Sequence, residues 1–165
     1  MTISLTLLHP LLGELTSRAL AIDDLPAVLA VEQRTHFTPW SEANLRSSIN
    51  SSHLCRGLFT QDGAIAGYAV FSLVAGEAEL LLFVIDGKHH GKGLGRLFLE
   101  SLIEQLADVA QALFLEVRAG NQPAISLYEN IGFNQVGERM NYYATPWGRE
   151  DALVYALELD LLEDG

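Results

Sequence analysis

The most constraining feature of this sequence is an apolar strand, a glycine-rich loop and an amphipathic helix in direct succession. Residues 77–86, EAELLLFVID, form an apolar run typical of a buried strand. Residues 91–111 are expected to form a helix, and its predicted buried face comprises Leu94, Leu97, Phe98, Leu102 and Leu106. A second apolar run, ALFLEV at 112–117, follows the helix. A strand, a helix and another strand in this order predict a parallel strand pair within an α/β fold.

The rest of the chain shows further helices and strands, which together predict a mixed α/β sheet. The expected elements are a helix at 22–36 capped by Asp23 and Asp24, a helix from Ser41, strands at 54–60 and 64–73, a helix at 121–133, and strands near 134–140 and 152–159. The two early strands flank Gln61-Asp62-Gly63, a strong hairpin signal. Asn121 is the expected N-cap of the helix that contains Pro123 and ends before Gly132.

Composition and cysteine content limit the class of protein. The chain has 165 residues, 49% of them hydrophobic, and no spacer or repeat, so residues 1–165 are expected to form one domain. Its one cysteine, Cys55, excludes an internal disulfide, and its five scattered histidines show no metal-ligand spacing. The apolar opening lacks a basic leading region and is too short for a membrane helix. These features predict a soluble, cytoplasmic protein without a membrane partner or a metal.

The charge distribution points to an anion site near the glycine loop. With 10 Lys plus Arg against 21 Asp plus Glu, the formal charge is −11, which disfavours nucleic-acid binding. Three of the ten cations nevertheless lie within nine residues, at Lys88, Lys92 and Arg96. Unpaired N–H groups and the positive end of the dipole at a helix start bind phosphate oxygens. The segment therefore predicts a phosphate-binding loop, with a tight turn and solvated cations as the alternative.

Two common nucleotide-binding loops do not fit this segment. The dinucleotide fingerprint requires G-x-G-x-x-G, whereas Gly91, Gly93 and Gly95 run G-x-G-x-G and Arg96 occupies the third glycine position. A P-loop requires four residues between its first glycine and Gly-Lys-Ser/Thr, and no such run exists here. The loop therefore belongs to another class of phosphate binder.

Two motifs resemble those of the GCN5-related N-acetyltransferases (GNAT). The sequence HGKGLG at 90–95 is similar to the family's Q/RxxGxG/A pyrophosphate loop, with His90 in place of Gln or Arg. The sequence NQPAISLYENIGF at 121–133 is similar to the family's NxxAxxLYxxxGF signature. Three segments further resemble the RimI-type protein N-terminal acetyltransferases, namely VEQRTHFTPWSE (31–42), FLEVRAGN (114–121) and NYYATPWGREDALVYAL (141–157). The resemblance covers about residues 20–159, and the first 15 or so residues are additional.

This resemblance implies a fold and a cosubstrate. The family's fold is a mixed, mostly antiparallel sheet flanked by helices, in which two parallel central strands splay apart to admit the pantetheine arm. The cosubstrate is acetyl-CoA, without a metal. The residues implied to bind it are His90, Gly91, Lys92, Gly93, Leu94, Gly95 and Arg96 at the pyrophosphate, Asn121 at the pantetheine arm, and the backbone N–H of Val84 or Ile85 at the thioester carbonyl.

Acetyl transfer to an amine needs a base for the amine and an acid for the departing thiolate. Glu116 is the charged residue of an apolar strand, where burial would raise the pKa of its carboxyl unless a cation compensates, and an ion pair with Arg118 is the structural alternative. Tyr128 would be a core tyrosine without the family context. The resemblance implies that Glu116 is the general base and that Tyr128 is the general acid.

The resemblance also implies an acceptor. Glu32, Trp40, Tyr142 and Tyr143 fall in segments similar to the family's peptide-binding walls, so they are expected to bind substrate. The implied acceptor is the basic N-terminus of a ribosomal protein, namely the alanine of the eighteenth small-subunit protein. Two alternatives remain open. One is a GNAT enzyme that acts on lysine or a small amine, and the other is an acyl-CoA-binding sensor domain without catalysis.

Overall fold

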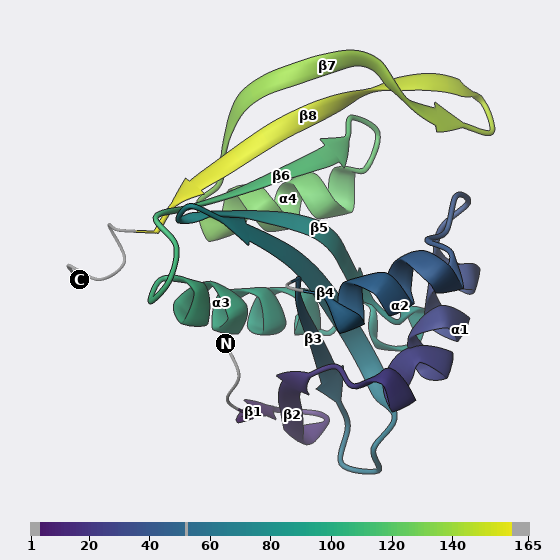
Figure 1. Ribbon diagram of the computed structural model, residues 1–165, viewed down its shortest axis with the longest axis vertical. Helices are drawn as coiled ribbons and strands as arrows, with labels where there is room; N and C mark the ends of the chain where they lie inside the picture. Colours follow the sequence, from purple (N-terminus) through teal and green to yellow (C-terminus); the bar gives the residue numbers. More distant parts are fainter. Residues whose placement is uncertain (1–3, 52, 160–165) are drawn as a thin grey trace. The chain divides into compact units, whose positions relative to one another are not determined.

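A computed structural model describes residues 4–51 and 53–159 of the chain (Figure 1). Within these residues the elements are, in chain order, β1 (Leu5–His9), β2 (Gly13–Ala19), the 3-10 helix η1 (Ile22–Asp24), α1 (Leu25–Thr35), α2 (Glu42–Asn50), β3 (Leu54–Phe59), β4 (Ile65–Val74), β5 (Glu77–Ile85), the 3-10 helix η2 (Gly87–His89), α3 (Leu94–Leu106), β6 (Ala112–Arg118), α4 (Gln122–Ile131), β7 (Asn134–Thr145) and β8 (Gly148–Glu158). The helices and strands expected between residues 22 and 159 are all present.

The strands form a mixed sheet with the hydrogen-bonded order β1-β2-β3-β4-β5-β6-β8-β7. The pairs β1–β2, β2–β3, β3–β4, β6–β8 and β7–β8 are antiparallel. β5 and β6 are parallel, and their pairing runs from Glu77↔Ala112 to Leu80↔Leu115, although both strands continue further. The predicted fold class, a mixed and mostly antiparallel α/β sheet with one parallel pair, is confirmed.

The described chain divides into two compact units. The first contains the residues up to Ser72 together with Leu82–Leu99, and the second contains Leu73–Leu81 together with the residues from Glu100 onward. The core of the first unit includes Leu15, Val28, Val31, Leu45, Leu58, Tyr68, Phe71 and Phe98. The core of the second includes Leu102, Leu106, Leu113, Leu115, Tyr128, Phe133 and Tyr155. The expectation of one domain over residues 1–165 stays a prediction.

The helix of the βαβ segment buries nearly the face that its spacing predicts. Four of the five predicted residues of α3, namely Leu94, Phe98, Leu102 and Leu106, are fully buried, while Leu97 is half-buried. Leu99 and Ile103 are buried as well, so the apolar stripe is wider than predicted. The wider stripe anchors α3 firmly at the end of the glycine loop.

The first nineteen residues contain a hairpin that was not predicted. β1 and β2 pair from Leu5↔Ser17 to His9↔Gly13, and β2 pairs in turn with β3. Gly13 adopts φ = 71°, a left-handed conformation that glycine tolerates best. The sequence did not predict these strands because the adjacent pairs Leu7-Leu8 and Leu11-Leu12 interrupt the strict alternation that identifies a half-buried strand.

The two helices of the first unit begin differently from each other. The helix predicted from Ser41 is α2, and Ser41 caps it, because its Oγ accepts the Asn44 N–H at 3.1 Å. Asp24 stands before α1 but does not cap it. Its carboxylate instead pairs with Arg18 at 2.8 Å and accepts the Ala21 N–H at 2.7 Å. Asp24 therefore helps to cap η1, with which the segment predicted as a helix at 22–36 begins, but its side chain makes no cap hydrogen bond to α1.

The second unit carries α4 and a long hairpin of β7 and β8, which extends beyond β6 in Figure 1. Asn121 caps α4, with its Oδ1 accepting the Ala124 N–H at 3.4 Å, and Gly132 follows the helix at φ = 123°. The strands predicted near 134–140 and 152–159 are several residues too short, since β7 reaches Thr145 and β8 begins at Gly148. The polar composition of this segment concealed its strand character.

Candidate active site

The glycine loop between β5 and α3 has an exposed backbone. Gly91 and Gly93 adopt φ = 75° and 78°, and a Cβ added at either position would meet no atom within 4 Å. Left-handed φ disfavours other residues, and the open space leaves the backbone accessible. A bare backbone that approaches a ligand closely is the feature that phosphate-binding loops share. The loop therefore fits the pyrophosphate group that its sequence predicts.

The N-terminus of α3 adds hydrogen-bond donors and charge to this loop. The Leu97 N–H donates to Gly93 O at 3.2 Å, so the preceding amides of the first turn lie before the helical hydrogen bonds begin. Lys92 and Arg96 carry the cationic groups, and the Lys92 Nζ lies 3.4 Å from Lys88 O. Leu94 is buried, so only its backbone could face an anion.

His90, the residue that departs from the family motif, has a defined contact of its own. Its Nε2–H donates to Ile85 O at 2.7 Å, because the carbonyl oxygen can only accept. This bond ties the start of the loop to the end of β5. The backbone of Val84 and Ile85, predicted to face the thioester, belongs to the same strand.

In the second unit, Glu116 on β6 forms an ion pair that the sequence did not predict. Its Oε1 lies 3.0 Å from the Arg139 Nε of β7, and the Glu116 side chain is 18% exposed. Arg118 pairs instead with Glu150 at 3.0 Å. The structure thus pairs Glu116 with Arg139 and Arg118 with Glu150, whereas the structural alternative had paired Glu116 with Arg118. Arg139 is the cation that can compensate burial of the Glu116 carboxylate.

Sequence reasoning missed Arg139 because only the strand register brings it near Glu116. Ala152 of β8 pairs with Arg118 on one side and with Arg139 on the other. Arg139 is therefore two strands away from β6 and reaches across β8 to the carboxylate. No local spacing in the sequence indicates such a contact.

Tyr128 on α4 lies in the core of the second unit and packs against Phe133, with ring centroids 5.7 Å apart. Burial raises the pKa of the Tyr128 phenol, and the nearby Tyr143 raises it further. The phenol therefore keeps its proton at neutral pH. A protonated hydroxyl in this position can donate a proton to a basic leaving group.

Tyr143 connects the Glu116 and Tyr128 side chains electrostatically. Burial raises the pKa of Tyr143 to about 12, and the negative charge of Glu116 contributes to this shift. Its ring meets Tyr142 edge-on at 5.2 Å, and the Arg139 guanidinium lies 5.2 Å from the Tyr142 ring centre. The second unit thus brings three predicted site residues, Glu116, Tyr142 and Tyr143, together around Arg139. The fourth, Tyr128, lies near Tyr143.

Glu32, a predicted substrate-binding residue in the first unit, is fully buried. Its Oε1 accepts the Tyr68 hydroxyl at 2.7 Å, while its Oε2 accepts His36 Nδ1–H at 2.8 Å and the Trp40 N–H at 2.9 Å. Burial alone would raise the pKa of Glu32, but these hydrogen bonds outweigh it and lower the pKa. Glu32 therefore holds the turn between α1 and α2, on which the half-buried Trp40 stands.

Within residues 4–51 and 53–159, no group of three or more His, Cys, Asp or Glu side chains could hold a metal ion. None of the helices described here has the length and apolar character that crossing a membrane requires.

Known proteins share both the sequence and the fold of this chain. Residues 25–133 match the acetyltransferase (GNAT) family, which uses acetyl-CoA. The chain is 44% identical over 147 residues to the [ribosomal protein bS18]-alanine N-acetyltransferase of Escherichia coli, covering 88% of this chain and 99% of that protein. A Haemophilus influenzae protein of the same name is 40% identical over 138 residues, covering 82% of this chain and 93% of that protein.

Solved structures agree with these relatives. The crystal structure of the E. coli ribosomal-protein-S18-alanine N-acetyltransferase superposes with a TM-score of 0.82 at 44% identity, over 88% of this chain and 94% of that chain. A spermidine/spermine N-acetyltransferase from Vibrio cholerae superposes with a TM-score of 0.77 at 18% identity, over 91% and 95% of the two chains, and shows the fold alone. The glycine loop, the sheet and these relatives together confirm the predicted family, and the chain belongs to the GNAT acetyltransferases.

Proposed function

We propose that this chain acetylates the α-amino group of a protein, and that the acceptor is the N-terminal alanine of ribosomal protein bS18. The observation that carries this proposal is the 44% identity to the E. coli bS18-alanine N-acetyltransferase, which extends over 99% of that protein. A match of this extent supports a shared acceptor, because it reaches beyond the segments that are expected to bind the cosubstrate. The fold alone does not identify the acceptor, because a spermidine/spermine N-acetyltransferase has the same fold.

The glycine loop would hold the pyrophosphate of acetyl-CoA, which supplies an acetyl group activated as a thioester. The proposed contacts come from the backbone of Gly91, Gly93, Leu94 and Gly95 and from the side chains of Lys92 and Arg96. His90 would act through the backbone, since its ring donates to Ile85 O. Asn121 would contact the pantetheine arm, and the Val84 or Ile85 N–H would polarise the thioester carbonyl.

The second unit would supply the proton transfers. The acceptor must be a neutral amine, and an α-amine with a pKa near 8 is about a tenth neutral at pH 7, whereas a lysine is neutral in roughly less than one molecule in a thousand. Glu116 would take the proton from the amine nitrogen, with Arg139 orienting its carboxylate. The Tyr128 hydroxyl, which keeps its proton at neutral pH, would protonate the departing thiolate sulfur.

The acceptor peptide would be bound by aromatic side chains. Tyr142 is 47% exposed on β7 and is supported by Tyr143 and Arg139, which suits a ring that contacts a peptide. Trp40 would also contact the acceptor, and its own position is fixed by the hydrogen bond of its N–H to Glu32. The formal charge of −11 would attract the basic terminus of a ribosomal protein and speed its association at low salt.

A pair of matched peptides tests this proposal. The first is a basic peptide that begins Ala-Arg, and the second has the same sequence with a blocked N-terminus and a free internal lysine. We expect site-mapped mass spectrometry to find the acetyl group on the α-nitrogen of the first peptide and no product from the second. Tyr142→Ala and Trp40→Ala should raise the peptide KM more than they raise the Kd for acetyl-CoA.

Other outcomes would support the alternatives. Acetylation of the internal lysine at a comparable rate would contradict the N-terminal acceptor and support a lysine- or small-amine-specific enzyme. Binding of acetyl-CoA without transfer to any peptide or amine would support a sensor domain.

A further inference from the structure

The hydrogen bonds of His9, at the end of β1, define the tautomer of its ring. Its side chain is buried, and its Nδ1 accepts the backbone N–H groups of Leu11 and Leu12 at 3.1 Å each. An imidazole nitrogen that accepts two hydrogen bonds carries no proton, so the proton of the neutral ring lies on Nε2. His9 therefore has one N–H to donate, and its direction is set by the turn at residues 10–12.

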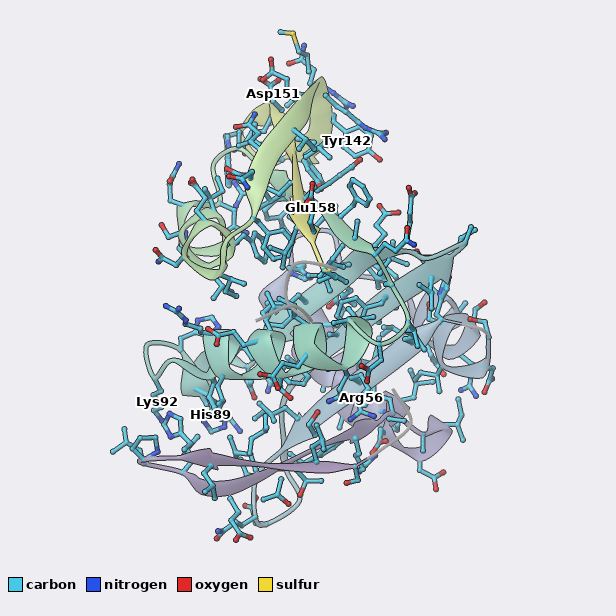
Figure 2. The ribbon with its side chains drawn as sticks, turned by 90° about the vertical axis from the view of Figure 1, so that its left-hand side faces the viewer. Arg56, His89, Lys92, Tyr142, Asp151 and Glu158 are labelled. Atoms are coloured by element: carbon cyan, nitrogen blue, oxygen red, sulfur yellow. The ribbon has the colours of Figure 1, made fainter. Side chains whose placement is uncertain are left out.

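That N–H connects the N-terminal hairpin to the glycine loop. His9 Nε2 lies 2.7 Å from Lys92 O, across 83 positions of sequence. Figure 2 shows Lys92 beside the turn end of the β1–β2 hairpin. Lys92 stands between Gly91 and Gly93, so the bond reaches the middle of the loop.

The loop itself offers little packing to hold its shape. A Cβ at Gly91 or Gly93 would meet no atom within 4 Å, and glycine has the widest choice of backbone conformations. Such a loop loses conformational entropy when it closes on a phosphate, and a tether that already restricts it lowers that cost. The His9 ring is a rigid tether, because β1 pairs with β2 along its whole length and β2 pairs with β3.

We propose that His9 is a positioning residue that holds the glycine loop in its phosphate-binding conformation. This inference rests on the proposed function of the loop as the pyrophosphate site. His9 acts through the Lys92 carbonyl and does not itself touch the cosubstrate. The hairpin of the additional N-terminal residues thereby acquires a role in cofactor affinity.

Two substitutions distinguish the effect of the hydrogen bond to Lys92 O from the effect of the hydrogen bonds that His9 accepts within the turn at residues 10–12. In His9→Asn, Oδ1 can still accept the Leu11 and Leu12 N–H groups, as Asn does in Asx turns, but no donor reaches Lys92 O. In His9→Gln, the Nε2 donor is retained and the acceptor at the δ position is lost. Leu8→Ala, on the neighbouring residue of β1 whose side chain is 72% exposed, is the matched control.

The measurements are the Kd for acetyl-CoA by calorimetry and amide hydrogen exchange of residues 91–95 without ligand. We expect His9→Asn to raise the Kd roughly 3- to 10-fold, the range that the loss of one hydrogen bond corresponds to, and to speed exchange in the loop. His9→Gln should recover most of the affinity, and Leu8→Ala should match the parent protein. The KM for S-acetylpantetheine, which lacks the pyrophosphate, should be the same in all four proteins.

Three results would overturn the inference. One is a parent-like Kd and parent-like loop exchange in His9→Asn, and another is an equal loss of affinity in His9→Gln, which would assign the effect to the turn. The third is an equal rise in the KM for S-acetylpantetheine, which would indicate general damage to the fold. Failure of the parent protein to bind acetyl-CoA would instead refute the proposed function, together with everything that rests on it.

Discussion

Glu32 and Glu116 are both glutamates that the sequence assigned to the active site, yet their surroundings differ. Glu32 is fully buried and accepts hydrogen bonds from Tyr68, His36 and the Trp40 backbone. Glu116 keeps 18% of its side chain exposed and is held by an ion pair with Arg139. A carboxylate surrounded by fixed donors stabilises the fold, whereas one with an accessible surface can exchange a proton with a ligand.

The sequence alone does not show whether a glutamate in an apolar segment has a structural or a chemical role. Its hydrogen-bond and ion-pair partners must be known first. Burial makes an unpaired carboxylate costly, so every such residue must find donors or cations. The number and rigidity of those donors then decide between a structural and a chemical role.

Glu116→Gln should lower kcat by about 10²- to 10⁴-fold, the contribution typical of a general base. The melting temperature and the Kd for acetyl-CoA should stay close to those of the parent, since glutamine retains the shape of the side chain. Steady-state kinetics with a peptide acceptor and calorimetry with acetyl-CoA measure the two effects. Glu150→Gln, which removes the carboxylate that pairs with Arg118, is the control and should leave kcat near the parent value. Parent-like turnover in Glu116→Gln would remove the distinction between the two glutamates.

Tyr128→Phe should lower kcat by about 10²-fold, near the lower end of the range for a proton donor. The ring still packs against Phe133, so the fold and acetyl-CoA binding should persist. Tyr155→Phe, at another buried tyrosine of the second unit, controls for the loss of a phenol from the core. If both variants slow turnover equally, the effect belongs to packing and Tyr128 is not the acid.

Glu32→Gln should lower the free energy of unfolding by about 1–3 kcal/mol, because its amide places a donor against the fixed donors His36 Nδ1–H and the Trp40 N–H. Urea denaturation followed by fluorescence measures this loss. Glu42→Gln removes an exposed ion pair with Arg46 and should cost less than about 0.5 kcal/mol. A large rise in the peptide KM at unchanged stability would instead make Glu32 a direct substrate contact.

The smallest effect concerns acid pH. The pKa of Glu32 lies below its ordinary 4.5 in the folded protein, because its hydrogen bonds outweigh burial. A carboxyl whose folded pKa is depressed stabilises the protein above its unfolded pKa, and this contribution is lost as the pH falls below about 4.5 through the folded value. We expect the parent protein to lose stability over this range more steeply than Glu32→Gln. Identical slopes would show that Glu32 is not ionised in the fold.

Much of this protein follows from local sequence. The strand, glycine loop and helix around residues 77–111, the caps Ser41 and Asn121, and the Gln61-Asp62-Gly63 hairpin all depend on spacing and turn chemistry within a few residues. The family is visible in two short motifs, because a phosphate-binding loop and a helix N-terminus are themselves local structures. Tyr128 was selected by its place in the second motif and Glu116 by its place in the segment at 114–121, and their roles stay predictions.

Tertiary structure decided which side chains meet. Arg139 reaches Glu116 because β8 pairs with both β6 and β7, and His9 reaches Lys92 O because a hairpin at the start of the chain lies beside a loop 83 positions later. Asp24 makes no side-chain cap hydrogen bond to α1, because Arg18 on β2, six positions earlier in the chain, pairs with its carboxylate. Contacts of this kind depend on strand register and on which of several donors binds a given carboxylate. Neither can be recognised from the spacing of residues in the sequence.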